Sequence, residues 1–158
     1  MYKRQGWYKE GEVVTVWAKD YVLEDGVRLR FKRWISNTPV SFIRPGVSES
    51  IIEIVANKPV QLIAEYEREC HVAVYDPYGG PMEEWVSCGD YIPLKVKPTV
   101  SLSEDVRMVF DSFIINGVRK LKDPSTLIKI DRPTTVQVVY KKEYLIRVTT
   151  PYGVKRYW

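Results

Sequence analysis

Histidine and cysteine are scarce in this chain of 158 residues, which has one His and two Cys. A Ser-His-Asp triad would depend on His71, and a tetrahedral zinc site needs more ligands than His71, Cys70 and Cys88 supply. Cys70 and His71 are neighbours on an expected strand, so their side chains point to opposite faces and do not form a dyad. We therefore predict no catalytic residue, metal or cofactor, and a protein that is not an enzyme.

Two other patterns with catalytic meaning are weak. The adjacent carboxylates Glu83 and Glu84 are interpreted as solvated loop charge rather than an acid/base pair. Gly79-Gly80 is followed by Pro81 and not by a helix, which indicates a turn rather than a phosphate-binding loop.

Long apolar runs are also missing. No segment approaches the ~20 apolar residues that a membrane helix needs. Residues 1–7 have a basic opening with no apolar core behind it, so they are not a signal peptide as they stand. The chain is then cytoplasmic, a mature region or a fragment. Asn and Gln occupy six positions, whereas Lys, Arg and Glu are plentiful, a composition that hints at a thermophilic source.

Helical periodicity is nearly absent, and alternating apolar residues predict strands instead. Turn residues separate these strands every ~8–12 residues, as in β-sandwiches and barrels. Asn116-Gly117 predicts a hairpin turn because both residues tolerate positive φ. We expect strands at 12–18, 26–35, 39–43, 50–56, 59–66, 69–75, 90–97, 105–115, 118–121, 125–131 and 133–140. Much of the apolar burial should come from Trp17, Phe31, Trp34, Phe110 and Phe113.

The second half of the sequence repeats the first. Trp7 and Gly11 match Trp85 and Gly89 at an offset of 78. At an offset of 79, the matches for Arg28, Phe31, Trp34, Ile35 and Pro45 are Arg107, Phe110, Phe113, Ile114 and Pro124. At an offset of 74, the matches for Ile54, Pro59 and Tyr66 are Ile128, Pro133 and Tyr140. Such turn and strand-centre residues are those that a shared fold restricts. We predict an all-β chain of two tandem, immunoglobulin-like, small β-sandwich domains.

The ends of the chain are out of phase with this repeat. Domain 1–67 lacks its own first strand, domain 68–141 is the second copy, and 142–158 holds an extra strand equivalent to the first strand of a further repeat. Three explanations stay open: the chain is a fragment of a longer array, the spare strand fills the vacancy in its own chain, or it fills the vacancy in a neighbouring identical molecule. The strand available for donation is Tyr144, Leu145, Ile146, Arg147 and Val148.

The two cysteines lie symmetrically about Gly79, the midpoint of an expected hairpin. We predict that Cys70 and Cys88 face each other across this hairpin and form a disulfide; the alternative is two buried free thiols. A disulfide implies an extracytoplasmic location or the cytosol of a hyperthermophile.

Positive charge is concentrated on one expected strand. The net charge is +4, and this strand carries Arg28, Arg30, Lys32 and Arg33. Basic side chains beside aromatic ones can bind single-stranded nucleic acid or another polyanion. The matching strand of the second half instead has Arg107, Val109, Asp111 and Ser112. This difference favours a solvated outer face over an anionic-ligand patch, and nucleic acid is not the expected partner.

Short motifs in the chain resemble tandem domains of extracytoplasmic and cell-envelope proteins of thermophilic archaea, including domains beside thermopsin-like secreted proteases. The motifs are Leu145 to Gly153, then Gly6-Trp7-Tyr8 with Gly11, then Gly26-Val27-Arg28 with Phe31 and Trp34. The second half departs from them, with Glu84-Trp85-Val86 and Asp105-Val106-Arg107. The resemblance implies a surface, adhesive or spacer role and carries over no catalytic residue.

Together these observations predict a non-catalytic structural or interaction module of a cell-surface or secreted protein. Its expected partners are neighbouring domains or identical subunits, assembled head-to-tail or closed on themselves. A polyanion-binding or single-stranded nucleic-acid-binding domain is one alternative, and an accessory domain of a secreted hydrolase is another.

Overall fold

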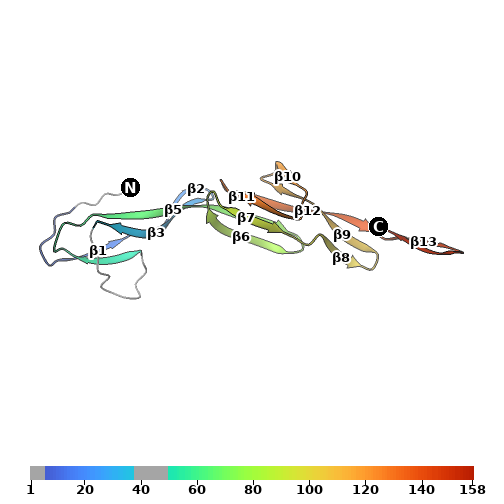
Figure 1. The fold of residues 1–158 in the computed structure, drawn as a ribbon, viewed down its shortest axis with the longest axis horizontal. Coiled ribbons are helices and arrows are strands. Elements are labelled where there is room, and N and C mark those ends of the chain that lie inside the picture. The colour runs from blue at the N-terminus through green and yellow to red at the C-terminus, as the bar shows by residue number, and fades with distance from the viewer. Residues whose placement is uncertain (1–5, 38–49) are drawn as a thin grey trace. The chain divides into compact units, whose positions relative to one another are not determined.

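The computed structural model describes residues 6–37 and 50–158, and within these ranges the chain is all-β (Figure 1). The predicted all-β class is therefore confirmed. No described segment is a helix of the length and hydropathy that crossing a bilayer requires. The strands are β1 (Val13–Trp17), β2 (Tyr21–Glu24), β3 (Val27–Ser36), β4 (Ile51–Val55), β5 (Leu62–Asp76), β6 (Gly80–Ser87), β7 (Tyr91–Lys95), β8 (Thr99–Ser103), β9 (Val106–Ile115), β10 (Arg119–Leu121), β11 (Ser125–Lys129), β12 (Thr134–Tyr144), β13 (Ile146–Thr150) and β14 (Gly153–Tyr157).

The chain divides into two compact units. Unit 1 comprises Met1–Glu24 and Arg28–Arg68, and unit 2 comprises Asp25–Val27 and Glu69–Trp158. Strand β5 contributes its first half to unit 1 and its second half, from Glu69 onward, to unit 2.

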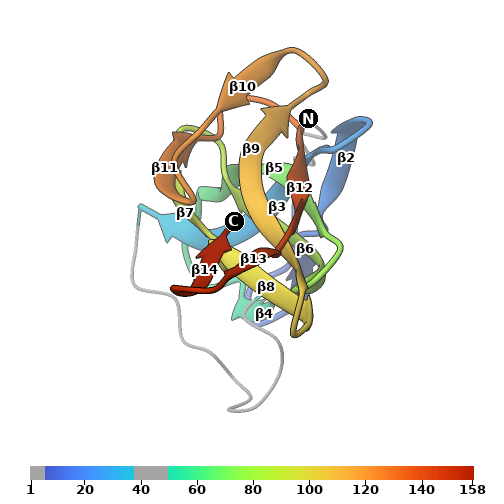
Figure 2. The same ribbon diagram turned by 90° about the vertical axis from the view of Figure 1, so that its right-hand side faces the viewer.

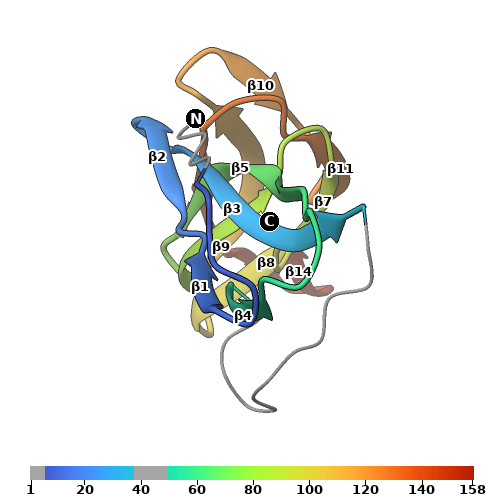
Figure 3. The same cartoon turned by 90° about the vertical axis from the view of Figure 1, so that its left-hand side faces the viewer.

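Unit 1 is built from two small groups of strands (Figure 3). In one group, β3 pairs with β2 on one side and with β5 on the other. In the other, β1 pairs antiparallel with β4, in a register that places Val13 opposite Val55 and Trp17 opposite Ile51. Alternation along β1 leaves Val14 and Val16 half-buried and the residues between them exposed.

Backbone hydrogen bonds close the loops of unit 1. The Gly11 N–H donates to the Ala56 carbonyl at 3.0 Å, and the Ala56 N–H donates to the Glu12 carbonyl at 2.8 Å. At the end of β3, the Asn37 N–H donates to the Gln61 carbonyl at 3.2 Å, while the Asn37 Oδ1 accepts the Gln61 N–H at 2.8 Å. Asn37 therefore fixes the chain where it enters β5.

Unit 2 has a larger sheet in which β9 lies next to β12 (Figure 2). Strands β8 and β10 pair antiparallel with β9, β12 pairs parallel with the second half of β5, and β6 pairs antiparallel with β5. A second sheet consists of β7 and β11. Side chains from both sheets meet in one core, which contains Cys70, Val72, Val74, Ile92, Leu94, Phe113, Ile115, Ile128, Ile130, Val136 and Val138.

The loops of unit 2 are also closed by hydrogen bonds. The Gly89 N–H donates to the Ile130 carbonyl at 2.7 Å, and the Ile130 N–H donates to the Asp90 carbonyl at 2.8 Å. The predicted turn at Asn116-Gly117 is present, with φ of 49° and 72°. Asn116 forms two hydrogen bonds of 2.8 Å with the backbone of Thr135. The Asn116 N–H donates to the Thr135 carbonyl, and the Thr135 N–H donates to the Asn116 Oδ1.

Several local predictions differ from the structure. The strands expected at 59–66 and 69–75 are one continuous strand, β5, and β2, β6, β8 and β14 were not predicted. The segment 39–43 lies outside the described residues. Trp17 was expected to be buried but is 58% exposed, because it lies on the outward face of β1. Phe113 is fully buried as expected, whereas Phe31, Trp34 and Phe110 are half-buried.

Candidate interaction site

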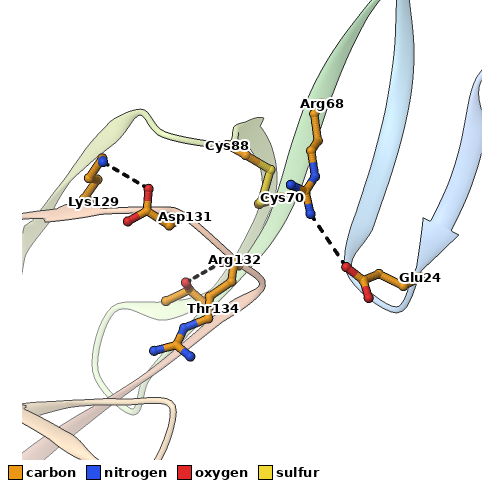
Figure 4. Close-up of a disulfide and its surroundings, with 8 residues drawn as sticks. All are labelled: Glu24, Arg68, Cys70, Cys88, Lys129, Asp131, Arg132 and Thr134. Carbon is orange, nitrogen blue, oxygen red and sulfur yellow. Dashed lines mark hydrogen bonds and ion pairs between the residues drawn. A yellow bond between two sulfur atoms is a disulfide. The ribbon is translucent and has the colours of Figure 1, made fainter.

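The predicted disulfide joins Cys70 on β5 to Cys88, the residue after β6 ends at Ser87 (Figure 4). The expected register is wrong by two residues: Val86, and not Cys88, lies opposite Cys70. The disulfide therefore crosses the hairpin diagonally, with the two Cα atoms 5.2 Å apart. Cys70 is fully buried, so the cross-link anchors the hairpin directly in the core of unit 2.

This β5–β6 hairpin covers one side of the unit 2 core. Val72 pairs in parallel with Thr134, and Val74 with Val136, so the hairpin extends the sheet beyond β12. Near its turn, Val74 and Met82 line a shallow hollow with Leu94 and Phe113. Burial of Val72 and Val74 is almost complete, which makes the hairpin an integral part of the unit 2 core.

In unit 1, one side of the first half of β5 has no partner strand among the described residues. Strand β3 lies on one side of β5. On the other side, β6 begins to pair with β5 only at Glu69, and within the described ranges no strand covers this other side at residues 60–63. Ile63 is 52% exposed and Leu62 is half-buried. An uncovered edge beside apolar side chains is a template for an incoming strand.

The predicted donor segment lies partly in β12 and partly in β13. Tyr144 is the last residue of β12 and lies opposite Val106, and the Leu145 N–H donates to the Asp105 carbonyl. Ile146, Arg147 and Val148 begin β13, which pairs with β14 through the turn at 151–152. The segment therefore spans the end of β12 and the start of β13, the first strand of a two-stranded hairpin, and is not a single strand.

The β13–β14 hairpin exposes its apolar side chains. Every residue of both strands is exposed, including Ile146 at 61% and Val154 at 58%. In Figure 1 the hairpin continues past the ends of β9 and β12. Clusters of exposed apolar residues of this kind mark interaction surfaces.

The four basic residues of the predicted anionic patch all lie on β3, but they do not act as one cluster. Arg33 forms an ion pair with Glu65 on the neighbouring β5, which neutralises its charge locally. Arg28 is half-buried, whereas Arg30 and Lys32 are exposed. Only part of the predicted patch therefore presents positive charge to solvent.

His71 and the neighbouring carboxylates are placed along the β5–β6 ladder. His71 Nε2 is 3.8 Å from the Glu83 carboxylate, and its ring lies 5.1 Å from that of Trp85. Glu84 lies opposite Val72. Over residues 6–37 and 50–158, no three His, Cys, Asp or Glu side chains are grouped so that they could hold a metal ion.

A charge cluster around Asp111 ties three strands of unit 2 together. Its Oδ1 is 2.7 Å from Lys141 Nζ on β12, its Oδ2 is 3.1 Å from Lys120 Nζ on β10, and the Ser112 hydroxyl donates to Oδ2 at 2.8 Å. The Lys141 ammonium, followed by the Ser112 hydroxyl and Lys120, holds the pKa of Asp111 well below its ordinary value. The ionised carboxylate therefore stabilises the folded unit.

We expect Asp111→Asn to lower the melting temperature at pH 7. Because the folded-state pKa is lowered, the stabilisation is complete above the ordinary carboxyl pKa of about 4 and is lost as pH falls below it. The difference in melting temperature between variant and wild type should thus shrink below about pH 4, measured by circular dichroism. Asp131→Asn, which breaks the exposed Lys129–Asp131 pair of 3.2 Å, is the matched control and should change little. A difference that stays constant down to pH 2 would contradict this role.

Comparison of the chain with protein-family models, curated proteins and solved structures gave no match.

Two features of the interaction site were not apparent from sequence reasoning. The second strand of each hairpin, β6 and β14, was not predicted, because Pro81 and the charged residues of both segments hide the alternation. The signal that was available is the shared Pro-Tyr-Gly sequence at 77–79 and 151–153, which lies just before β6 and at the start of β14.

Proposed function

We propose that the chain consists of two copies of one immunoglobulin-like β-sandwich fold and serves as a non-catalytic structural or interaction module of a cell-surface or secreted protein. Strands β1, β2, β3, β4 and the first half of β5 would then correspond to β7, β8, β9, β11 and β12. The observation that carries the proposal is the agreement of strand registers and loop hydrogen bonds between the two units.

Strand register supports the correspondence. In unit 1, β1 pairs with β4 so that Val13 lies opposite Val55. In unit 2, β7 pairs with β11 so that Tyr91 lies opposite Lys129. These four residues are related by the offsets of 78 and 74 found in the sequence. Because a slip of one residue would turn every side chain to the other face, agreement in register is a demanding test.

Loop hydrogen bonds agree at the same offsets. The pair Gly11 to Ala56 corresponds to Gly89 to Ile130, and both glycines have positive φ, 84° and 104°. Asn37 bonds the backbone of Gln61 in the way that Asn116 bonds that of Thr135. Buried or turn backbone groups need such partners in any fold, but two unrelated folds would not place them at matching positions.

Aromatic packing gives a third, independent agreement. The Phe31 ring lies 5.3 Å from that of Trp34 and 5.9 Å from that of Tyr66. The Phe110 ring lies 4.8 Å from that of Phe113 and 6.1 Å from that of Tyr140. The pKa of Tyr66 and the pKa of Tyr140 are both raised, and burial is the largest cause in each case.

The surface or secreted location is supported by the disulfide and by the resemblance of the Gly-Trp-Tyr and Pro-Tyr-Gly motifs to archaeal envelope domains. Disulfides persist in oxidising compartments, or in the cytosol of hyperthermophiles. The proposed module acts mechanically, as rigid domains that present loops or exchange strands with their neighbours. It is equally compatible with an accessory domain of a secreted hydrolase, in which the catalytic residues lie on another domain.

Polyanion binding is the weaker alternative. Arg33 is paired with Glu65, and Asp111 stands in unit 2 where Lys32 stands in unit 1. A module whose two copies shared this purpose would keep the positive charge. Salt-dependent binding to heparin or single-stranded DNA, lost on Arg30→Glu together with Lys32→Glu, would establish this alternative instead.

Labelling of intact cells that carry the native gene tests the proposed location. A membrane-impermeant biotin reagent should label the protein as strongly as other surface proteins, and alkylation under acid quench should find Cys70 and Cys88 oxidised. A cytosolic enzyme from the same cells is the unlabelled control. Labelling only after cell lysis, or reduced thiols in the quenched sample, would overturn the proposal.

A further inference from the structure

The first unit has an incomplete core. Seven residues of the unit 2 core have counterparts in unit 1 at the sequence offsets of 78, 79 and 74. The unit 2 residues are Ile92, Leu94, Phe113, Ile128, Ile130, Val136 and Val138. Their unit 1 counterparts, in the same order, are Val14, Val16, Trp34, Ile54, Ala56, Leu62 and Ala64. All seven are buried in unit 2, whereas all seven are only half-buried in unit 1. Among the described residues, unit 2 has in addition the covering hairpin of β5 and β6 and the short strand β10, whose counterpart in unit 1 falls outside the described ranges.

The chain also has a second hairpin with a related turn sequence and a turn that is one residue shorter. Strands β13 and β14 meet at Thr150 and Gly153 through a Pro-Tyr turn, as β5 and β6 meet at Asp76 and Gly80 through Pro-Tyr-Gly. At the offset of 74, Cys70, Val72 and Val74 correspond to Tyr144, Ile146 and Val148. The first three are buried and the last three are 60%, 61% and 43% exposed.

We propose that the β13–β14 hairpin of a second copy of this chain docks on the open edge of unit 1 and completes its core. This inference rests on the proposed repeat, since the equivalence of the two units defines both the vacancy and its occupant. Unit 2 itself supplies the precedent: it already seats an equivalent hairpin on the equivalent edge. A second copy carries the same hairpin and the same open edge, so each chain both donates and accepts a hairpin.

The contacts in unit 2 define the register of the docked strand. Thr134 to Gln137 pair in parallel with Val72 to Tyr75. Transferred by the offset of 74, Val60 pairs with the partner's Ile146, and Leu62 pairs with the partner's Val148. The side chains of the donated Ile146 and Val148 then take the positions in the unit 1 core that Val72 and Val74 occupy in unit 2. Because donor and acceptor surfaces differ, the contact is heterologous and continues as a chain of subunits.

The disulfide of unit 2 provides a geometric test of this register. Its cysteines Cys70 and Cys88, whose Cα atoms are 5.2 Å apart, correspond to Tyr144 of the donor and Glu10 of the acceptor. A cysteine at each of these positions would have the Cα separation that a disulfide requires only when the hairpin is docked. Both native residues are exposed, so the substitutions leave the folded units intact.

The experiment mixes equal amounts of two single variants, Glu10→Cys and Tyr144→Cys, in a glutathione redox buffer. We expect a cross-linked dimer on a non-reducing gel and a linked peptide pair containing residues 10 and 144 by mass spectrometry. Thr149→Cys, exposed on the opposite face of β13, is the control partner for Glu10→Cys. The 10–144 cross-link should exceed the 10–149 cross-link at least tenfold.

Two outcomes would overturn the proposal. One is equal cross-linking with Tyr144→Cys and with Thr149→Cys. The other is a 10–144 cross-link found only within monomers of the double variant, which assigns the hairpin to its own chain. In either case the Cys70–Cys88 peptide pair and the surface labelling still report on the proposed function, so the two failures are distinguishable.

A second variant changes the docking surface without touching the core of unit 2. Val148→Asp places a charge on the exposed hairpin, where it should leave the Cys70–Cys88 disulfide and the circular dichroism spectrum unchanged. The association constant between chains, measured by sedimentation velocity over a range of concentrations, should fall at least tenfold in this variant. Association that persists undiminished in this variant contradicts docking through β13.

Discussion

Ile128→Ala is expected to destabilise unit 2 by about 3 kcal/mol, whereas Ile54→Ala should cost unit 1 roughly half as much. The two residues are of one type and occupy positions on β11 and β4 that the proposed repeat makes equivalent, but Ile128 is 3% exposed and Ile54 is half-buried. Truncating a buried isoleucine leaves a cavity in addition to the lost transfer free energy. At a half-buried site, water fills the space and the loss is smaller.

Amide hydrogen exchange measures the two units separately. The Ile130 N–H, bonded to the Asp90 carbonyl, reports on unit 2, and the Ala56 N–H, bonded to the Glu12 carbonyl, reports on unit 1. Each substitution should accelerate exchange at its own probe and leave the other almost unchanged, at concentrations where the chain is monomeric. Equal losses at both probes would mean that the core of unit 1 is as closed as that of unit 2.

Removing the disulfide with Cys70→Ala and Cys88→Ala should have an effect of similar size. The bond closes a loop with a sequence separation of 18, and the loss of this constraint on the unfolded chain costs about 3 kcal/mol. For a unit of this size the melting temperature should fall by roughly 10–20 °C. The β5–β6 hairpin would lose its anchor in the core, since Cys70 is fully buried.

Differential scanning calorimetry of the double variant checks this prediction, and wild-type protein in a strong reductant is the control that should reproduce the shift. Exchange at the Ala56 amide should stay unchanged, because the disulfide lies within unit 2. A shift of less than about 5 °C would mean that the hairpin is held mainly by its ladder hydrogen bonds and by Val72 and Val74.

The alternating strands could be predicted from the sequence because one face of each is apolar. Strands β1, β7 and β11 show this pattern plainly, and the Asn116-Gly117 turn has the residues that positive φ requires. Strand β6 could not be predicted in the same way. Its sequence begins Gly-Pro-Met-Glu-Glu, and its strand conformation depends on pairing with β5, a contact that local propensity does not encode.

The pairing of the cysteines could be predicted, but their register could not. Symmetry about Gly79 correctly suggested that Cys70 and Cys88 meet. Turn geometry then decided the alignment: Asp76 pairs with Gly80, and Gly80 has the positive φ of 85°. This centres the hairpin on Tyr78 and places Val86 opposite Cys70.

Counting strands predicted that domain 1–67 lacks its own first strand, which stays a prediction, and the form of the segment proposed for donation differs from the one expected. Sequence reasoning expected a single strand at Tyr144 to Val148, and the structure has Tyr144 at the end of β12 and a hairpin after it. The difference arises because β12 continues past the core of unit 2 to pair with Val106. A hairpin brings two strands, and so it can cover more of an exposed core than one strand can.

Backbone nuclear Overhauser contacts across β1–β4 and β7–β11 test the shared fold most directly. We expect contacts between Val14 and Ile54 and, at the corresponding positions, between Ile92 and Ile128. A register displaced by one residue in either pair would place the apolar side chains of that strand on the outer face. That result would contradict the equivalence of the two units, and with it the vacancy that the donated hairpin is proposed to fill.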